Sequence, residues 1–391
     1  MKLKILIIGA ELEGIEAVYL AQEAGYEIIV IDKDPQALTR EMVDQFIVVN
    51  VFEEDIMLTL FEEVDVVLPV IKNEKVISQI LKYGRKKNTP VIADLDAYQL
   101  SHSKVQSNHL FETLKLPISS KYPNCHFPVI VKSDTHRKHV GATKINTQTE
   151  LENFLKTQKY PVIIEEYLQG RSFALEVIGD SNRYCYPLTT EKIVDRNDDC
   201  KTVIAPANIS NELELEILNI AKRLSKKIKI NGIFEIEVIN HKGVLKLLTI
   251  DARLPSQTPI SVYHATGVNM VKILIEMRLG TFQYFDYQYK QVCLYQQICV
   301  KDGTIAVLGQ QAILKCNSLK RIKGIFESKE MITDYEKGKK EFTAIVIITG
   351  QTLKQAQERF DNCIQCIQKT KEFSQWKWLK TESVPPLDQS I

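Results

Sequence analysis

Short apolar runs alternate with amphipathic stretches along residues 1–95. Runs such as KLKILIIGA, YEIIVIDKDP and VDVVLPVI have the continuous apolar character of parallel strands that are buried on both faces. Stretches such as EGIEAVYLAQEAG and VISQILKYGRKK carry apolar residues at helical spacing, and a glycine ends the first of them. This alternation predicts a Rossmann-like N-terminal unit, with DQFIVVN and TPVIAD as further strands.

Beyond residue 95 the chain no longer alternates regularly between strand and helix. Apolar runs predict strands at residues 127–133, 142–145, 160–168, 172–180, 183–193, 232–240 and 244–253, and amphipathic stretches predict helices at 105–116, 211–228 and 267–280. A smaller α+β region follows after about residue 290. We therefore expect α/β and α+β architecture in three domains, at residues 1–95, 96–290 and 291–391.

The segment LLTIDARLPSQTP, residues 247–259, carries ionic side chains at the end of an apolar strand. Strand alternation places on one face Leu247, Thr249, Asp251 and Arg253. A proline then ends the strand, and three hydrogen-bonding side chains follow before the next proline. An acid and a base at the end of a core strand indicate a functional site.

The composition mainly excludes classes of partner and of location for this protein. Of the 391 residues, 45% are hydrophobic and 25% are charged, which is ordinary for a globular enzyme with two or three domains. The net charge of +1, from 50 basic and 49 acidic residues, gives no sign of a nucleic-acid or membrane partner. The apolar runs are too short to cross a bilayer, and the first run is a strand rather than a signal peptide, so we expect a cytoplasmic protein.

The cysteines indicate reduced thiols rather than a disulfide framework or a zinc site. Eight of them are spread along the chain, mostly singly in apolar stretches. Cys363 and Cys366 form a lone C-x-x-C pair, which cannot complete a tetrahedral zinc site. We expect them on one face of a surface helix.

The first loop, GAELEG, differs from a dinucleotide-binding fingerprint. Gly9 and Gly14 flank the turn, but Glu11 stands where a glycine would let the backbone approach a pyrophosphate, and Glu13 follows. Two carboxylates repel phosphate, which argues against an NAD-dependent oxidoreductase. They fit the ammonium groups of an amino-acid substrate, and a solvated acidic loop is the alternative. Asp32 ends the second strand, where a ribose is often held.

Two lysines and a strand end fit a nucleotide site. Lys132 closes the run FPVIVKS before a polar loop that ends at Gly141, and Lys104 precedes a helix. Each lysine suits a nucleotide phosphate, and each is also compatible with an ordinary surface position. In VIIEEYLQG an apolar strand continues into residues 165–168 and is followed by a glycine turn. This pattern is typical of a hinge segment whose backbone N–H and C=O groups form hydrogen bonds with the edge of an adenine ring. Two solvated acids at a strand end are the alternative.

The strongest constellation is a pair of strands, GIFEIEV and LLTIDAR, with NHKG at the turn between them. Glu235 and Glu237 share one face, as do Thr249, Asp251 and Arg253. If the strands form a hairpin, three carboxylates converge and require a counter-cation, and oxygen ligands select Mg²⁺, with Mn²⁺ as the alternative. In phosphoryl transfer the metal bridges phosphate oxygens, and an arginine stabilises charge on the transferring group.

The chain resembles the ATP-grasp carboxylate–amine ligases in the order of its features. These features are the Rossmann-like unit, the two lysines, the E-E-Y-L hinge and the acidic hairpin that ends in D-A-R. Within that family, DARLPSQTP, LEVIGD, DKDPQAL and IIEEYLQG are similar to the ligases that join 3-methylornithine to lysine in pyrrolysine biosynthesis. The resemblance runs over nearly the whole chain. It implies that ATP phosphorylates the carboxylate of 3-methyl-D-ornithine, or of D-ornithine, and that the side-chain amine of L-lysine attacks the acyl phosphate. It implies small-molecule partners, with a homodimer as one option.

The resemblance also implies roles for individual residues. Nucleotide binding falls to Asp32, Lys104, Lys132, Gly141, Glu165, Glu166, Tyr167 and Leu168. Metal binding falls to Glu237 and Asp251, with Glu235 added because it shares a strand face with Glu237. Amino-acid binding falls to Glu11, Leu12, Glu13, Arg171, Asp251, Ala252, Arg253, Leu254, Pro255 and Ser256. Arg253 is the catalytic candidate.

Several positions depart from the family pattern. Thr249 stands where the metal strand usually has glutamate, and we expect Glu235 to compensate. Arg171 and Lys72 stand where acidic residues are expected, and HRKH at 136–139 replaces a serine-rich loop. These changes leave two alternatives: a ligase for another amino-acid pair, or an ATP-binding paralogue without turnover.

Overall fold

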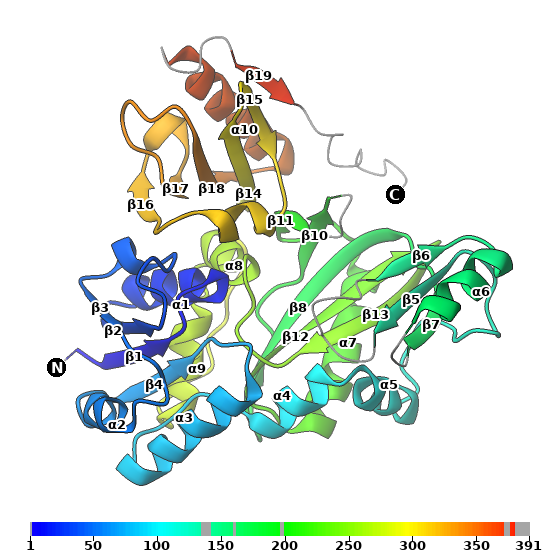
Figure 1. Cartoon of the computed structure of the whole chain (residues 1–391), viewed down its shortest axis with the longest axis horizontal. Helices are drawn as coiled ribbons and strands as arrows, with labels where there is room; N and C mark the ends of the chain where they lie inside the picture. The colour runs from blue at the N-terminus through cyan, green and yellow to red at the C-terminus, as the bar shows by residue number, and fades with distance from the viewer. Residues whose placement is uncertain (1, 134–141, 159–161, 196–198, 371–375, 380–391) are drawn as a thin grey trace.

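The computed structural model of the chain describes residues 2–133, 142–158, 162–195, 199–370 and 376–379. Three sheets organise these residues, and Figure 1 shows a parallel sheet at the N-terminus, a long central sheet and a small sheet at the opposite side from the parallel one. The prediction of mixed α/β and α+β architecture is confirmed.

The N-terminal sheet is parallel, with strand order β3-β2-β1-β4. Its elements are β1 (Lys4–Ile8), α1 (Leu12–Glu23), β2 (Glu27–Asp32), η1 (Arg40–Met42), β3 (Gln45–Val48), α2 (Glu54–Glu62), β4 (Val66–Pro69) and α3 (Glu74–Lys87). The segment TPVIAD contributes an isolated bridge between Val91 and Val67 rather than the strand expected there. The strands of this sheet end at a common edge, where α1 and α3 begin.

The small sheet is antiparallel, with strand order β6-β5-β7. Its strands are β5 (Val129–Ser133), β6 (Thr143–Ile145) and β7 (Val162–Glu166), and α6 (Gln148–Thr157) packs beside them. The helices α4 (Leu95–His102) and α5 (Lys104–Thr113) connect it to the N-terminal sheet (Figure 1).

The central sheet runs in the order β13-β12-β8-β10-β11-β14-β18-β17-β16. Its first part consists of β8 (Gly170–Asp180), β9 (Tyr184–Cys185), β10 (Thr190–Val194), β11 (Cys200–Ala205), α7 (Asn211–Ile228), β12 (Asn231–His241), β13 (Val244–Asp251), α8 (Thr258–Thr266) and α9 (Met270–Arg278). The strand expected at residues 183–193 is split into β9 and β10, and β11 was not predicted. The alternation along β8 and β12 is regular, so one face packs on α7 while the other carries polar residues.

The same sheet continues into the C-terminal region, because β11 pairs with β14 across the boundary expected near residue 290. The second part consists of β14 (Val292–Lys301), β15 (Thr304–Val307), η2 (Gln310–Lys315), β16 (Lys320–Lys323), η3 (Ile325–Glu327), β17 (Glu330–Thr333), β18 (Phe342–Gly350), α10 (Leu353–Lys369) and β19 (Lys377–Leu379). All residues of β18 are buried: one face of the strand packs on α10, and the other face packs in the core cluster shared with α1, α8 and α9. Cys363 belongs to the buried face of α10, while Cys366 is half-buried. Among the described helices, none is long and apolar enough to cross a membrane.

Candidate active site

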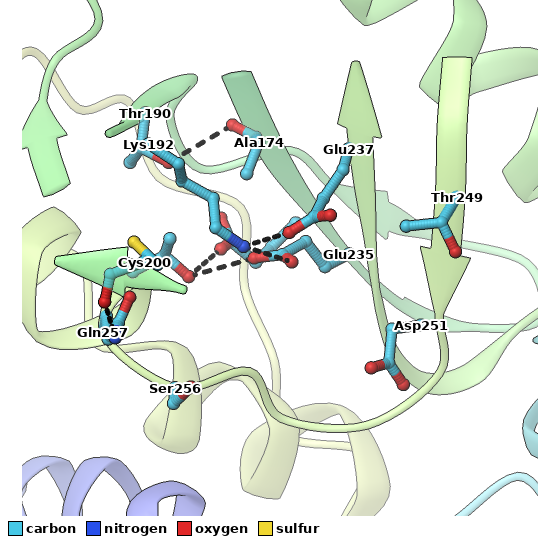
Figure 2. Close-up of polar contacts among 12 residues, drawn as sticks. Ala174, Thr190, Lys192, Cys200, Glu235, Glu237, Thr249, Asp251, Ser256 and Gln257 are labelled. Carbon is cyan, nitrogen blue, oxygen red and sulfur yellow. Dashed lines mark hydrogen bonds and ion pairs between the residues drawn. The ribbon is translucent and has the colours of Figure 1, made fainter. Parts of the chain in front are cut away.

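Three carboxylates lie in one row across neighbouring strands of the central sheet. In the strand register, Glu235 of β12 is opposite Glu176 of β8 on one side and opposite Asp251 of β13 on the other. Glu237 lies one pleat further along β12, opposite Thr249. The predicted hairpin is therefore present in the structure, and its two strands carry Glu235, Glu237 and Asp251 (Figure 2).

A bulge in β13 changes which of its residues face this cluster. Between Glu237 and Val238 the register skips one residue, so that Val238 is opposite Leu247. Leu247 therefore lies in the core with Ile250, three positions further on, instead of facing the site with Thr249 as expected from strict alternation. Because of the bulge, Leu247 packs in the core while Thr249 and Asp251, further along the same strand, lie beside Glu237 and Glu235.

Lys192 is the cation of this cluster, and it was not identified from the sequence. Its Nζ lies 3.2 Å from Glu235 Oε1 and also pairs with Glu237, so the ammonium sits between both carboxylates (Figure 2). Burial disfavours the charge of Lys192, but the two glutamates outweigh burial and hold its pKa above the usual range. The segment TTEKI offered only the alternation of a strand, because the partner acids lie more than 40 residues away.

Glu176 was also missed as a site residue. Its side chain is fully buried and accepts a hydrogen bond from the Thr258 hydroxyl, and burial raises its pKa. An acid at the centre of the apolar run SFALEVIGD was the available signal. Buried acids of this kind are rare unless they are paired or functional.

A chain of ion pairs connects the end of β13 to the N-terminal sheet. Arg253 bonds to Asp251 through Nη2 and to Glu13 Oε1 through Nη1 at 2.6 Å. The carboxylate of Glu13, which is 2% exposed, also receives Lys72 Nζ at 2.8 Å. The predicted partners Glu13, Asp251 and Arg253 are thus brought together, and Lys72 joins them.

A cavity of about 280 Å³ opens beside this chain of ion pairs, at the common edge of the parallel strands. Glu11, Glu13, Asp32 and Lys72 are among the residues that line it. Asp32 is not free for a ribose, because its carboxylate accepts hydrogen bonds from the backbone amides of Ala10 at 2.9 Å and Asp34 at 3.0 Å. The lining combines charged and apolar side chains, and its size suits an amino acid rather than a nucleotide.

The nucleotide candidates gather on the small sheet. Lys132 Nζ lies 3.1 Å from Glu165 Oε2, and Asn108 and Ser119 also bond this buried carboxylate. These contacts outweigh burial and lower the pKa of Glu165. The side chain of Glu165 is therefore committed to Lys132.

The rest of the predicted nucleotide set surrounds the same strands. Glu166 accepts a hydrogen bond from the backbone amide of Ser120 at 3.3 Å, and Lys144 stacks over the Tyr167 ring at 4.3 Å. Leu168 is half-buried at the end of this segment, and Lys104 is the first residue of α5. Gly141 and the HRKH loop at 136–139 lie outside the described residues.

Three predicted substrate residues have other roles in the structure. Arg171 forms a two-pronged ion pair with Glu191 at 2.7 and 2.8 Å and stacks on Phe173, on the face of β8 opposite Glu176. The side chains of Leu12 and Leu254 are buried in the core beneath α1, so only their backbone groups are available to a substrate. Sequence alternation could not separate these cases, because it gives no information on partners in other strands.

The remaining predicted residues flank the end of β13. The amide of Ala252 donates to Ser101 Oγ at 3.1 Å, Pro255 is buried, and Ser256 Oγ donates to Gln310 Oε1 at 3.2 Å. The site therefore draws on all three sheets and on the C-terminal region.

Known proteins share this architecture. Residues 91–277 match the family model described as the D-ala D-ala ligase C-terminus. The biotin carboxylase domain of 2-oxoglutarate carboxylase from Hydrogenobacter thermophilus, solved with MgADP, ADP and bicarbonate, has a TM-score of 0.72 at 14% identity, covering 93% of this chain and 90% of that one. The L-amino acid ligase from Bacillus licheniformis has a TM-score of 0.68 at 15% identity, covering 93% and 97%. At these identities the likeness shows the ATP-grasp fold alone.

A comparison with curated relatives defines the family. The chain is 32% identical over 312 residues to the 3-methyl-D-ornithine–L-lysine ligase of Methanosarcina mazei, covering 79% of this chain and 81% of the relative. This similarity confirms the resemblance identified from DARLPSQTP and the E-E-Y-L hinge. The chain belongs to the family of 3-methyl-D-ornithine–L-lysine ligases, ATP-grasp enzymes that form a carbon–nitrogen bond.

Proposed function

We propose that this chain uses ATP to activate the carboxylate of 3-methyl-D-ornithine and joins it to the side-chain amine of L-lysine, releasing ADP and phosphate. The similarity to the Methanosarcina mazei ligase, which covers most of both chains, is the observation that carries this proposal. The ionic cluster supports it, because acyl-phosphate chemistry requires fixed cations near the transferred phosphate.

The small sheet would hold the nucleotide. The ion pair with Glu165 restrains Lys132, so that its ammonium is oriented before a phosphate arrives. Lys104 would supply a second phosphate contact from the start of α5. Backbone groups at residues 166–168 would form hydrogen bonds with the edge of the adenine ring, since the side chain of Glu165 is already paired with Lys132.

The acidic cluster fits Mg²⁺ in the manner typical of this ion. No three acidic, histidine or cysteine side chains of the described residues meet as a complete metal cage. Mg²⁺, however, is usually held by one or two carboxylates while waters and phosphate oxygens supply the remaining ligands. Glu237 and Asp251 would provide those carboxylates, because Glu235 is almost fully buried beside Lys192 and Thr258. The bound ion would neutralise phosphate charge.

Arg253 would stabilise the activated carboxylate. Asp251 and Glu13 hold its guanidinium on two sides, and Lys72 balances the second of these acids. The amine nitrogen of lysine would attack the carbonyl carbon of the acyl phosphate, and phosphate would leave with the electrons of the broken C–O bond. The attacking amine must first lose a proton, which its own burial would favour.

A ligase for a different amino-acid pair is the second candidate. The ion pair between Lys72 and Glu13 favours it, because this pair occupies an acid that would otherwise be available to a substrate ammonium. The nucleotide residues would be unchanged in that case.

The deciding experiment measures ADP release from Mg–ATP with L-lysine plus 3-methyl-D-ornithine or D-ornithine, and it identifies the products by mass. An amide that contains both amino acids is the expected result. ADP release without incorporation of lysine would favour another acceptor amine. Binding of ATP with no ADP release from any amino-acid pair would contradict the ligase proposal.

A further inference from the structure

The turn that follows the site strand contains a residue in an unfavourable backbone conformation. Gln257 has a φ of 78°, in the left-handed region that residues with a side chain rarely adopt. Such a conformation costs about 1–3 kcal/mol and persists only where surrounding contacts hold it. The turn lies directly between Ser256, which borders the proposed substrate site, and the start of α8.

Glu16 of α1 is the group that holds this turn from the N-terminal domain. Its side chain is fully buried, and Oε2 accepts a hydrogen bond from the backbone amide of Ile260 at 2.8 Å. The backbone amide of Gln257 also faces the Glu16 carboxyl group and favours its charged form. On the other side, Oε1 accepts a hydrogen bond from the Tyr295 hydroxyl of β14 at 3.3 Å.

Glu16 replaces a cap that α8 lacks. The first amides of a helix have no partner within the helix, and a side chain at the N-cap position usually accepts from them. Gln257 occupies that position, but its side chain makes no capping bond and donates instead to the carbonyl of Cys200 at 3.2 Å. The acceptor for the first turn of α8 therefore comes from a residue more than 240 positions away in the chain.

We propose that Glu16 is a positioning residue for the amino-acid substrate, acting through the backbone of residues 257–260. This inference rests on the proposed function and on the family resemblance, which implies that residues 254–256 bind the amino-acid substrate. Glu16 would act as a hydrogen-bond acceptor rather than as a charge. Burial raises the pKa of Glu16 to about 8, so a neutral acid, which keeps one carbonyl oxygen, is the prevailing form at neutral pH.

Three substitutions of Glu16 distinguish the effects of its hydrogen-bond acceptor, of the length of its side chain and of its charge. Glu16→Gln keeps a carbonyl oxygen at the same distance, and its KM for the carboxylate-donating amino acid should stay within roughly threefold of the wild-type value. Glu16→Ala removes the acceptor, and Glu16→Asp withdraws it by one methylene while keeping the acid. Both should raise that KM roughly tenfold or more, while the KM for Mg–ATP stays unchanged, because a small misplacement near the reacting groups is costly.

Glu23→Gln is the matched control. Glu23 lies seven residues after Glu16 on the same helix and also bonds to α8, where it accepts from the Tyr263 hydroxyl at 2.8 Å, outside residues 257–260. Its substitution should leave the KM for the amino acid within roughly threefold of wild type. An equal rise of the KM for the amino acid in Glu23→Gln and Glu16→Asp would overturn the inference. Any loosening of the contact between α1 and α8 would then be enough to raise this KM.

Amide hydrogen exchange tests the inference independently of turnover. Peptides that cover residues 256–262 should lose protection in Glu16→Ala and Glu16→Asp and keep it in Glu16→Gln. Unchanged protection and unchanged KM in Glu16→Asp would overturn the positioning role, and this variant also decides the matter if Glu16→Ala does not fold. If the wild-type enzyme releases no ADP with these amino acids, the proposed function fails, whereas the exchange pattern still decides whether Glu16 holds the turn.

Discussion

Lys192 sets the charge of the candidate active site, because it is the cation that lies between Glu235 and Glu237. Replacement by methionine keeps the length of the side chain but leaves the nearly buried carboxylate of Glu235 and the partly exposed carboxylate of Glu237 without their counter-ion. We expect Lys192→Met to lower the free energy of unfolding by about 3–5 kcal/mol, as is typical when one partner of a buried ion pair is removed. It should also nearly abolish ADP release, because the two carboxylates would repel each other and leave their present positions.

Urea denaturation and an ADP-release assay would check this prediction. Lys201→Met, on the neighbouring strand β11, is the control and should change stability by less than about 1 kcal/mol. Equal losses in the two variants would contradict a special role for Lys192.

Glu16 makes stability depend on pH. Because burial raises its pKa from 4.5 to about 8, the folded state binds a proton that the unfolded state releases between these values. The stability contributed by neutral Glu16 is complete below about pH 4.5 and is lost as the pH rises through about 8. Glu13 on the same helix adds to the unfavourable environment for its charge, whereas the hydrogen bond from Tyr295 on β14 favours the charged form. Cys293 on β14 also faces this group.

The difference between wild type and Glu16→Gln isolates this effect. The midpoint of urea denaturation should fall more steeply between pH 5 and pH 8 in wild type than in Glu16→Gln, since glutamine does not titrate. Parallel pH profiles would show that other groups account for the whole dependence.

At the scale of elements, the turn between β12 and β13 controls whether the acidic hairpin forms in the observed register. Lys242 and Gly243 occupy the two central positions, with φ values of 53° and 82°, as a type I′ turn requires. No atom lies within 4 Å of the position that a Cβ would take at Gly243, so Gly243→Ala is limited only by backbone strain. We expect it to lower stability by about 1 kcal/mol.

A substitution at the preceding position should act in the opposite direction. Asparagine tolerates the left-handed region better than lysine, so Lys242→Asn should raise stability by a few tenths of a kcal/mol, or about 0.5 kcal/mol at most. Chemical denaturation of both variants measures the pair of effects. A loss of stability in Lys242→Asn would be inconsistent with a turn of this type.

At the scale of the whole molecule, Arg321 joins the C-terminal region to the N-terminal domain. Its guanidinium pairs with Glu330 on β17 and with Glu23 on α1, each at 2.7 Å, and lies 4.0 Å from the centre of the Tyr19 ring. Arg321→Ala would leave the nearly buried Glu330 without its arginine, and we expect a loss of about 3 kcal/mol in the free energy of unfolding.

The adjacent residue of β16 provides the control for Arg321→Ala. Lys320 pairs with Glu336 at 3.4 Å, and the side chain of Glu336 is 69% exposed. Exposed pairs of this kind contribute about 0–1 kcal/mol, so Lys320→Ala should have little effect on thermal unfolding. Similar shifts of the melting temperature in both variants would argue against a structural role for the Arg321 contacts.

Several parts of the fold were predictable because hydrophobic patterning depends on neighbours in the chain. The parallel N-terminal unit and the acidic hairpin follow from runs of apolar residues and from a turn signal. The prediction from hydrophobic patterning was wrong at two places. The bulge in β13 places Leu247 in the core instead of beside Thr249, and no strand was predicted at β11. It also gave no sign that the central sheet continues from β11 into β14.

The amino-acid sequence by itself determined the secondary structure of most segments, the family, and the identity of Glu237, Asp251 and Arg253 as candidate site residues. Only the tertiary structure decided which charges meet. The ion pairs of Lys192 with Glu235, of Lys72 with Glu13 and of Arg171 with Glu191 each join different elements of the fold. The reason is physical: periodicity shows which face of an element a residue occupies, whereas the partner of a buried charge depends on strand order and register across the folded molecule.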